Sequence, residues 1–133
     1  MILISTSAVL YGVWGLFAKI GTNNLSPNSV ISISILVHIP VAIYLLSIQG
    51  FKIEGSYRGI IFAALFGLVG LAGDYFFVQA LKVGDVGVTT AVSALYPVIT
   101  IFLGYVVMSE TLTLKQFLGV ALGFIASYLI MQD

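Results

Sequence analysis

The segment from Leu65 to Leu81, LFGLVGLAGDYFFVQAL, is apolar enough to lie in lipid, yet it contains Asp74 and Gln79. A carboxylate in a helix at membrane depth costs about 3 kcal/mol, so it normally faces protein or water. Gly67, Gly70 and Asp74 share one helix face, because steps of three and four residues return to the same side. Glycines on that face allow close helix approach. We therefore expect Asp74 to point into a helix contact or a cavity beside it.

The composition of the whole chain requires a bilayer as its solvent. Of the 133 residues, 60% are hydrophobic and only 8% are charged, and the mean hydropathy is +1.16. A soluble domain needs a polar surface, with commonly about a quarter of its residues charged. The sequence therefore predicts an all-α integral membrane protein with the lipid bilayer as a partner.

Several classes of function are disfavoured by what the sequence lacks. The net charge is zero, which argues against a nucleic-acid partner. There is no cysteine, and the single histidine and scattered acids lack the spacing of a metal site. No phosphate-binding glycine loop or Ser–His–acid arrangement is recognisable. We expect no metal, no cofactor and no enzymatic activity.

The apolar runs divide the chain into five membrane helices and leave room only for short loops. A span needs about 20 residues, and the N-terminal run, which has no charged region before it, is interpreted as a retained helix and not a signal peptide. We predict one five-helix domain over residues 1–133, with helices at about 2–20, 27–48, 57–82, 86–108 and 113–131.

Local signals mark the ends of three of these helices. Gly21 is expected to end the first helix, since glycine is the preferred residue just past a helix C-terminus. Ser26 is expected to cap the second helix and Pro27 to open it. Thr113 with Gln116 has the spacing of a capping box for the last helix.

Pro97 lies near the middle of the predicted fourth helix and is expected to kink it. Ser93 and Tyr96 lie close to it, and Ser93 and Pro97 belong to a face of small and mildly polar residues. Such a face suits helix contact or a water-accessible cavity better than lipid.

The basic residues are almost evenly divided between the two sides of the membrane. With five spans, Lys52, Arg58 and Lys115 lie on one side, and Lys19 and Lys82 lie on the other. The positive-inside rule counts Lys and Arg near helix ends, and a difference of one is a weak bias. The sequence therefore permits insertion both ways, which would build an inverted pair of copies.

A characteristic order of motifs runs through the second half of the chain. An aromatic-rich helix is followed by a glycine–aspartate turn, a proline-containing helix that ends at a glutamate, and a final helix with a polar start. These elements are Ala80-Leu81, Gly84-Asp85, Pro97, Glu110, Leu112-Thr113, Gln116 and Gly119, with Trp14-Gly15 and Lys19 in the first helix. Their order and spacing resemble an EamA domain, the repeat of the drug/metabolite transporter superfamily.

The resemblance implies a membrane transporter of small metabolites or drugs that works by alternating access. Most members carry two such domains, so this chain would be half of a ten-helix inverted-repeat transporter. It would function as an antiparallel or paired dimer, either a homodimer or a heterodimer with a paralogue. It would be a multi-pass protein of a prokaryotic plasma (inner) membrane. The small multidrug resistance proteins differ, because their first helix carries an essential glutamate that is not found here.

Two sets of residues are candidates for function. The substrate or ion pathway is expected to include Asp74, His38, Trp14, Tyr75, Gln79, Ser93, Tyr96, Pro97 and Lys19. Helix packing or dimer contact is expected at Gly67, Gly70, Gly119, Gly123 and Ser127. Two alternatives stay open: Lys19 can be explained by snorkelling, and the chain can be a non-transporting membrane subunit that packs against a partner through its glycine faces.

Overall fold

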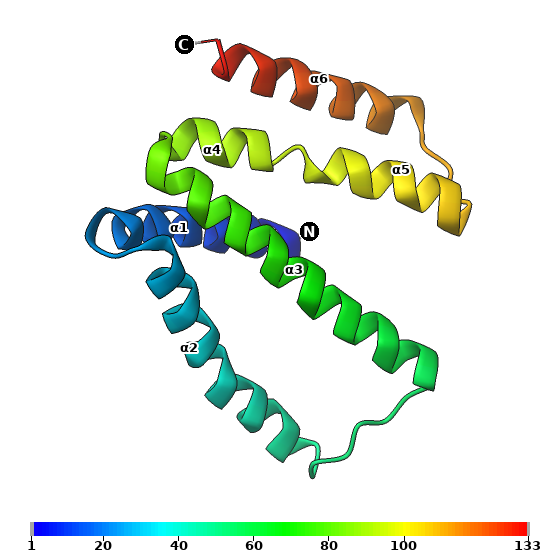
Figure 1. Ribbon diagram of the computed structural model, residues 1–133. Coiled ribbons are helices and arrows are strands. Elements are labelled where there is room, and N and C mark those ends of the chain that lie inside the picture. Colours follow the sequence, from blue (N-terminus) through cyan, green and yellow to red (C-terminus); the bar gives the residue numbers. More distant parts are fainter. Residues whose placement is uncertain (1, 133) are drawn as a thin grey trace. The chain divides into compact units, whose positions relative to one another are not determined.

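The computed structural model describes residues 2–132, which form two compact units that divide after Val83. The described residues contain six α-helices and no strand (Figure 1). The fold is therefore all-α, as the sequence predicts. Each unit is described by itself below.

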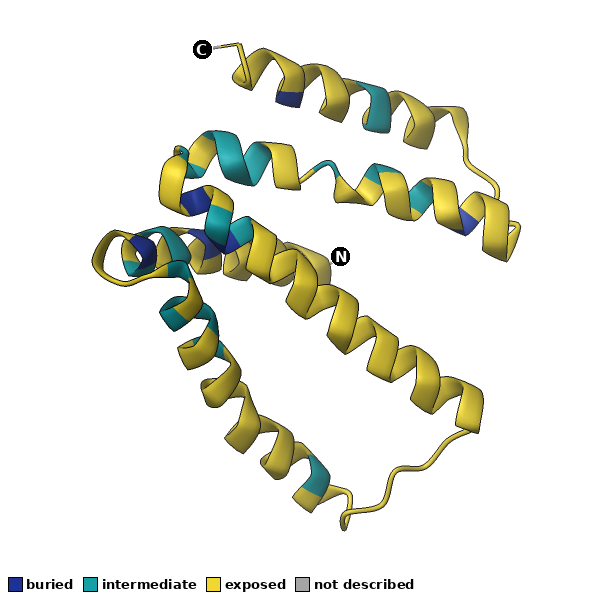
Figure 2. Cartoon of the chain, viewed as in Figure 1, coloured by how far each residue is buried: buried dark blue, intermediate teal, exposed yellow. Residues whose placement is uncertain are grey.

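The first unit contains α1 (Ile2–Asn24), α2 (Pro27–Ile48) and α3 (Tyr57–Val83). Each of these helices contacts the other two. The buried residues of the unit, Gly15, Thr22, Val78 and Leu81, lie in the second half of α1 and near the end of α3 (Figure 2). From there, α2 and α3 diverge toward the loop that joins them (Figure 1).

Helix α1 does not end at Gly21, in contrast to the sequence prediction. It continues to Asn24, and the amide of Leu25 still donates to the Gly21 carbonyl at 2.8 Å. A Cβ atom at Gly21 would lie 3.3 Å from a methyl group of Val30 on α2. The glycine therefore allows α2 to approach α1 closely, and it has no role in ending the helix.

The second unit contains α4 (Val86–Ser93), α5 (Tyr96–Met108) and α6 (Leu114–Ile130). The expected helix over 86–108 forms one span that is long and apolar enough to cross a membrane, and the structure interrupts it at Ala94 and Leu95, which is a sharper break beside Pro97 than the expected kink. Pro97 has no amide hydrogen to donate to the carbonyl of Ser93, and its ring would clash with that carbonyl. The chain instead makes a turn there, in which the Leu95 amide donates to the Val92 carbonyl at 3.1 Å.

Two helix starts are built as the sequence predicts. The Ser29 amide donates to the Ser26 hydroxyl at 3.2 Å, and Pro27 opens α2. At α6, the Gln116 amide donates to the Thr113 hydroxyl at 3.3 Å, and the Thr113 amide donates to the Gln116 side chain at 2.9 Å. Both bonds of the capping box are present.

The surface of the described chain is that of a protein that lies in lipid. Four segments are long and apolar enough to cross a membrane: α1, α2, α3 and the combined span Val86–Met108. Helix α6 is also apolar, with 17 residues. Large apolar side chains remain exposed along these segments, Phe66 at 83% for example. This is a multi-pass membrane protein.

Candidate functional site

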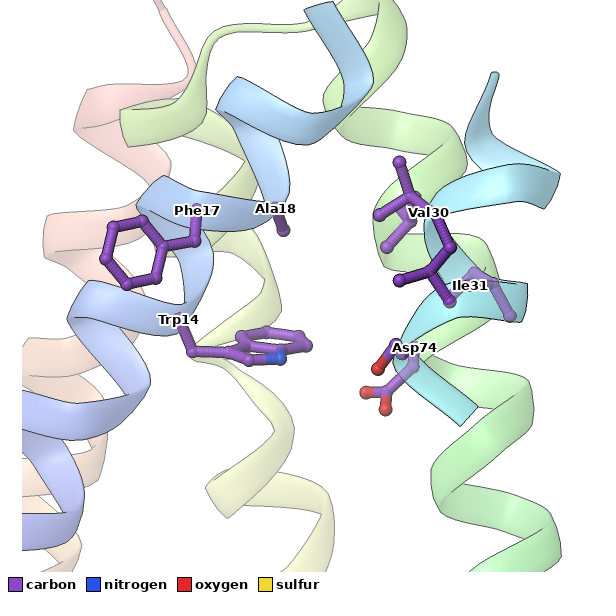
Figure 3. A pocket seen from close by; sticks show the side chains of 9 residues that line it. Trp14, Phe17, Ala18, Val30, Ile31 and Asp74 are labelled. Carbon is purple, nitrogen blue, oxygen red and sulfur yellow. The ribbon is translucent and has the colours of Figure 1, made fainter. Parts of the chain in front are cut away.

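A pocket of about 220 Å³ lies between the three helices of the first unit (Figure 3). Its wall is apolar apart from Ser34 and one acid, Asp74. Figure 3 shows the Trp14 side chain extending from α1 toward Asp74 on α3, with Val30 and Ile31 projecting from α2. The lining residues are Trp14, Phe17, Ala18, Val30, Ile31, Ile33, Ser34, Asp74 and Val78.

Asp74 is the one charged group on the pocket wall. Its carboxylate accepts no hydrogen bond and forms no ion pair with any residue in the part of the chain that the structure describes. A protonated His38 on α2 would attract this carboxylate electrostatically. A carboxylate in this position is costly in lipid unless water or a ligand solvates it. The pocket provides the space for either.

Trp14 contributes an aromatic wall whose orientation is held by its neighbours. Its ring stacks on Phe77 of α3, with ring centroids 5.0 Å apart and an angle of 16° between the planes. Tyr11 meets it edge-on, with centroids 6.4 Å apart. Trp14 also lines a second hollow, of about 310 Å³, with Ser7, Leu10 and Tyr11 along α1. Stacking of this kind stabilises one ring position.

His38, Gln79 and Tyr75 are not part of the pocket wall. The Nδ1 atom of His38 lies 2.6 Å from the Ser34 carbonyl, and it must be the donor because a carbonyl only accepts. The Gln79 side chain donates to Asn28 on α2 at 3.3 Å. The ring of Tyr75 meets the ring of Phe76 edge-on, with centroids 5.6 Å apart.

Lys19 also lies away from the pocket wall, in a reciprocal pair with Lys82. The Lys19 ammonium on α1 donates to the Leu81 carbonyl of α3 at 2.7 Å. The Lys82 ammonium on α3 donates to the Thr22 carbonyl of α1 at 2.6 Å. Both carbonyls belong to the last turn of their helices, where no amide of the same helix is available. We call these two lysines with Thr22 and Leu81 the lysine clasp.

The remaining pathway candidates belong to the second unit. Ser93 is the last residue of α4, and Tyr96 and Pro97 are the first two residues of α5. All three therefore border the break between these helices. Their place in a substrate path stays a prediction.

The glycines proposed for helix packing have free space within their own units. A Cβ atom at Gly67, Gly70, Gly119 or Gly123 would meet nothing within 4 Å. Ser127 behaves differently, because it is buried and its hydroxyl donates to the Ala91 carbonyl of α4 at 3.2 Å. Ser127 thus joins α6 to α4, while the role of the four glycines stays a prediction.

Residues 2–132 contain no group of three or more His, Asp or Glu side chains that could hold a metal ion. The pocket offers a solute a single carboxylate, a hydroxyl, an indole, a phenyl ring and aliphatic groups. This set can bind and orient a small molecule.

Several residues at these sites were missed from the sequence. Phe77 and Asn28 belong to apolar or capping patterns that carry no functional signal of their own. Lys82 could have been identified from the sequence, since it lies near the end of its helix as Lys19 does in the first helix. Only the crossing of α1 and α3 makes the two lysines reciprocal.

Comparison with known proteins gives one match. A family model described as the EamA-like transporter family matches residues 1–132. No curated protein and no solved structure matches the chain.

Proposed function

The chain belongs to the EamA-like transporter family. On this premise we propose that it carries a small metabolite or drug across the membrane by alternating access. We propose that the solute passes through the pocket that Asp74 lines. The family consists of membrane transporters, so we propose no enzymatic reaction. We place the protein in a prokaryotic plasma membrane.

The observation that carries this proposal is the position of the Asp74 carboxylate. It lies inside a 27-residue apolar helix, about two turns and a half before its end, at the wall of a pocket formed by three helices. An acid at membrane depth is expected to mark a substrate or ion path. A purely structural acid would instead be paired, and no residue in the described part of the chain pairs with this one.

We further propose that residues 1–133 form one five-helix domain that is completed by a second copy or a paralogue. The four glycines with free space, Gly67, Gly70, Gly119 and Gly123, are the proposed contact positions. Small residues allow helix backbones to approach closely in membranes. We also propose that Ser93, Tyr96 and Pro97 of the second unit contact the substrate.

The dimer contact can be tested by cross-linking, because the chain contains no natural cysteine. Gly123 lies near the centre of α6, so it would meet its own copy in either a parallel or an antiparallel pair. We expect Gly123→Cys to form a disulfide-linked dimer in the membrane. Ile125→Cys, on another face of α6 and exposed at 56%, is the control. Equal cross-linking of both variants would contradict this contact.

A second candidate function is a non-transporting subunit that packs against a partner protein through the same glycine positions. The free space at these glycines is the observation that favours it. Liposomes that contain the purified protein separate the two functions. Uptake of metabolites and cationic drugs, measured with and without a pH gradient, should saturate and show counterflow for a carrier. Flux without saturation indicates a channel, and no flux indicates the subunit.

A further inference from the structure

We infer that the pocket between α1, α2 and α3 binds a small organic cation with an apolar body, such as an amine or a quaternary ammonium ion. Asp74 supplies the opposite charge and Trp14 an aromatic surface. This inference rests on the proposed function, because it names the class of solute that the carrier would accept.

The charge of the wall favours a cation over an anion. Asp74 is the single charged lining residue, and no lysine or arginine lines the pocket. The two nearest helix-end lysines, Lys19 and Lys82, donate to backbone carbonyls in the lysine clasp. An anionic solute would therefore meet a carboxylate on the wall, and the nearby titratable base, His38, lies off the wall and acts on Asp74 itself. A cation would offset the cost of keeping Asp74 charged in an apolar pocket.

The aromatic wall favours an organic cation over a metal ion. Phe77 stacks on one face of the Trp14 ring, yet Trp14 is still 38% exposed and lines the pocket. Tryptophan is the best aromatic partner for ammonium groups, which it attracts within about 6 Å of the ring. The other lining side chains, among them Val30, Ile31 and Val78, would contact the apolar part of the ligand.

The size of the pocket favours a metabolite-sized ligand. Its volume of about 220 Å³ is below the range of roughly 300–1,000 Å³ that is usual for drug-sized ligands. Benzyltrimethylammonium combines a quaternary charge with one aromatic ring and is a suitable probe. Benzenesulfonate has a similar size and the opposite charge, which makes it the matched ligand control.

The single tryptophan of the chain makes this binding directly measurable. Trp14 is the one tryptophan in the sequence, so its intrinsic fluorescence reports on this pocket and on the second hollow that the same ring lines. We expect a saturable change in the fluorescence of the purified protein in detergent when benzyltrimethylammonium is added. Benzenesulfonate at the same concentrations should leave it unchanged. Equal binding of both ions would overturn the inference.

Three variants test the role of the carboxylate. Asp74→Asn keeps the shape, removes the charge and should weaken cation binding about tenfold or more. Asp74→Glu keeps the charge and should retain binding, which shows that the site tolerates substitution. Asp85→Asn removes an exposed acid that makes no side-chain cap bond at the start of α4, and it should bind as the wild type does. Wild-type affinity in Asp74→Asn would overturn the inference.

Parallel transport measurements in liposomes separate this inference from the proposed function. If the cation binds through Asp74 but crosses no membrane, the transport proposal fails and the cation site stands. If a neutral or anionic solute is transported saturably and the cation neither binds nor competes, the cation site fails and the transport proposal stands.

Discussion

Two places in the first unit hold charged side chains within membrane helices, and they differ in how each charge is satisfied. In the lysine clasp, both ammonium groups donate to backbone carbonyls at 2.6–2.7 Å, beside Thr22 and Leu81, which are fully buried. In the pocket, Asp74 has no such partner among the described residues. The clasp therefore connects two helix ends, whereas the carboxylate remains available to a solute.

The contrast shows that a charge at membrane depth indicates function only when its partners are known. Lys19 and Asp74 are both expected in the substrate path from the sequence, because both are costly in lipid. The structure gives Lys19 a structural partner on α3, where a cation also suits the C-terminal end of the helix dipole. Four variants test whether this division holds. They are given in order from the largest expected effect to the smallest.

Asp74→Asn should lower the rate of saturable transport in liposomes by about tenfold or more, because the path loses the charge that attracts its solute. The measurement is initial uptake at equal protein density. Asp85→Asn is the matched control and should transport at the wild-type rate. Undiminished transport by Asp74→Asn would mean that Asp74 is a structural charge, and the contrast between Asp74 and the lysine clasp would then be wrong.

Lys19→Met combined with Lys82→Met should lower the stability of the protein, since each substitution leaves a helix-end carbonyl without its charged donor. Hydrogen bonds to charged groups contribute about 1.5–3 kcal/mol each. Thermal unfolding in detergent measures the loss, and Lys115→Met at the start of α6 is the control. Binding of benzyltrimethylammonium by the folded fraction should persist. Lost binding with unchanged stability would assign the lysines to the site.

Ser127→Ala extends the comparison to the second unit, where Ser127 is a buried polar group with a partner. Its loss removes the bond to the Ala91 carbonyl and should cost about 1 kcal/mol of stability. Transport per folded molecule should not change. Ser47→Ala, which removes an exposed bond within α2, should affect neither quantity. A transport defect in Ser127→Ala at wild-type stability would mean that paired polar groups also serve the path.

His38→Gln should have the smallest effect, a change in cation affinity of about twofold or less. His38 acts on Asp74 by charge but does not line the pocket, and such effects are weak where water enters. The Trp14 fluorescence titration with benzyltrimethylammonium measures it. A tenfold change in affinity would mean that His38 belongs to the binding site.

The local features of the fold could be predicted because neighbouring residues alone produce them. Ser26 and Pro27 start α2, and Thr113 with Gln116 starts α6, through bonds between residues three apart. The break beside Pro97 was underestimated as a kink, although its cause, the missing amide hydrogen, is also local. Length and hydropathy likewise sufficed for the assignment to the membrane.

The candidate site could be predicted only in part. Asp74 and Trp14 were identified as candidates, and they line one pocket. Gln79, Tyr75 and Lys19 were grouped with them on the same reasoning, yet they contact Asn28, Phe76 and the end of α3. Polarity in an apolar helix indicates that a residue needs a partner, but it does not identify the partner.

The sequence by itself determined that this is an all-α membrane protein, where most of its helices begin and end, and to which transporter family it belongs. Tertiary structure alone decided that α1 continues past Gly21, that Lys19 and Lys82 pair reciprocally, and that Asp74 faces Trp14 across a pocket. The physical reason is that these helices are apolar on nearly all sides, so no amphipathic face marks their rotation. Contacts between residues some 60 positions apart follow only from how the helices cross.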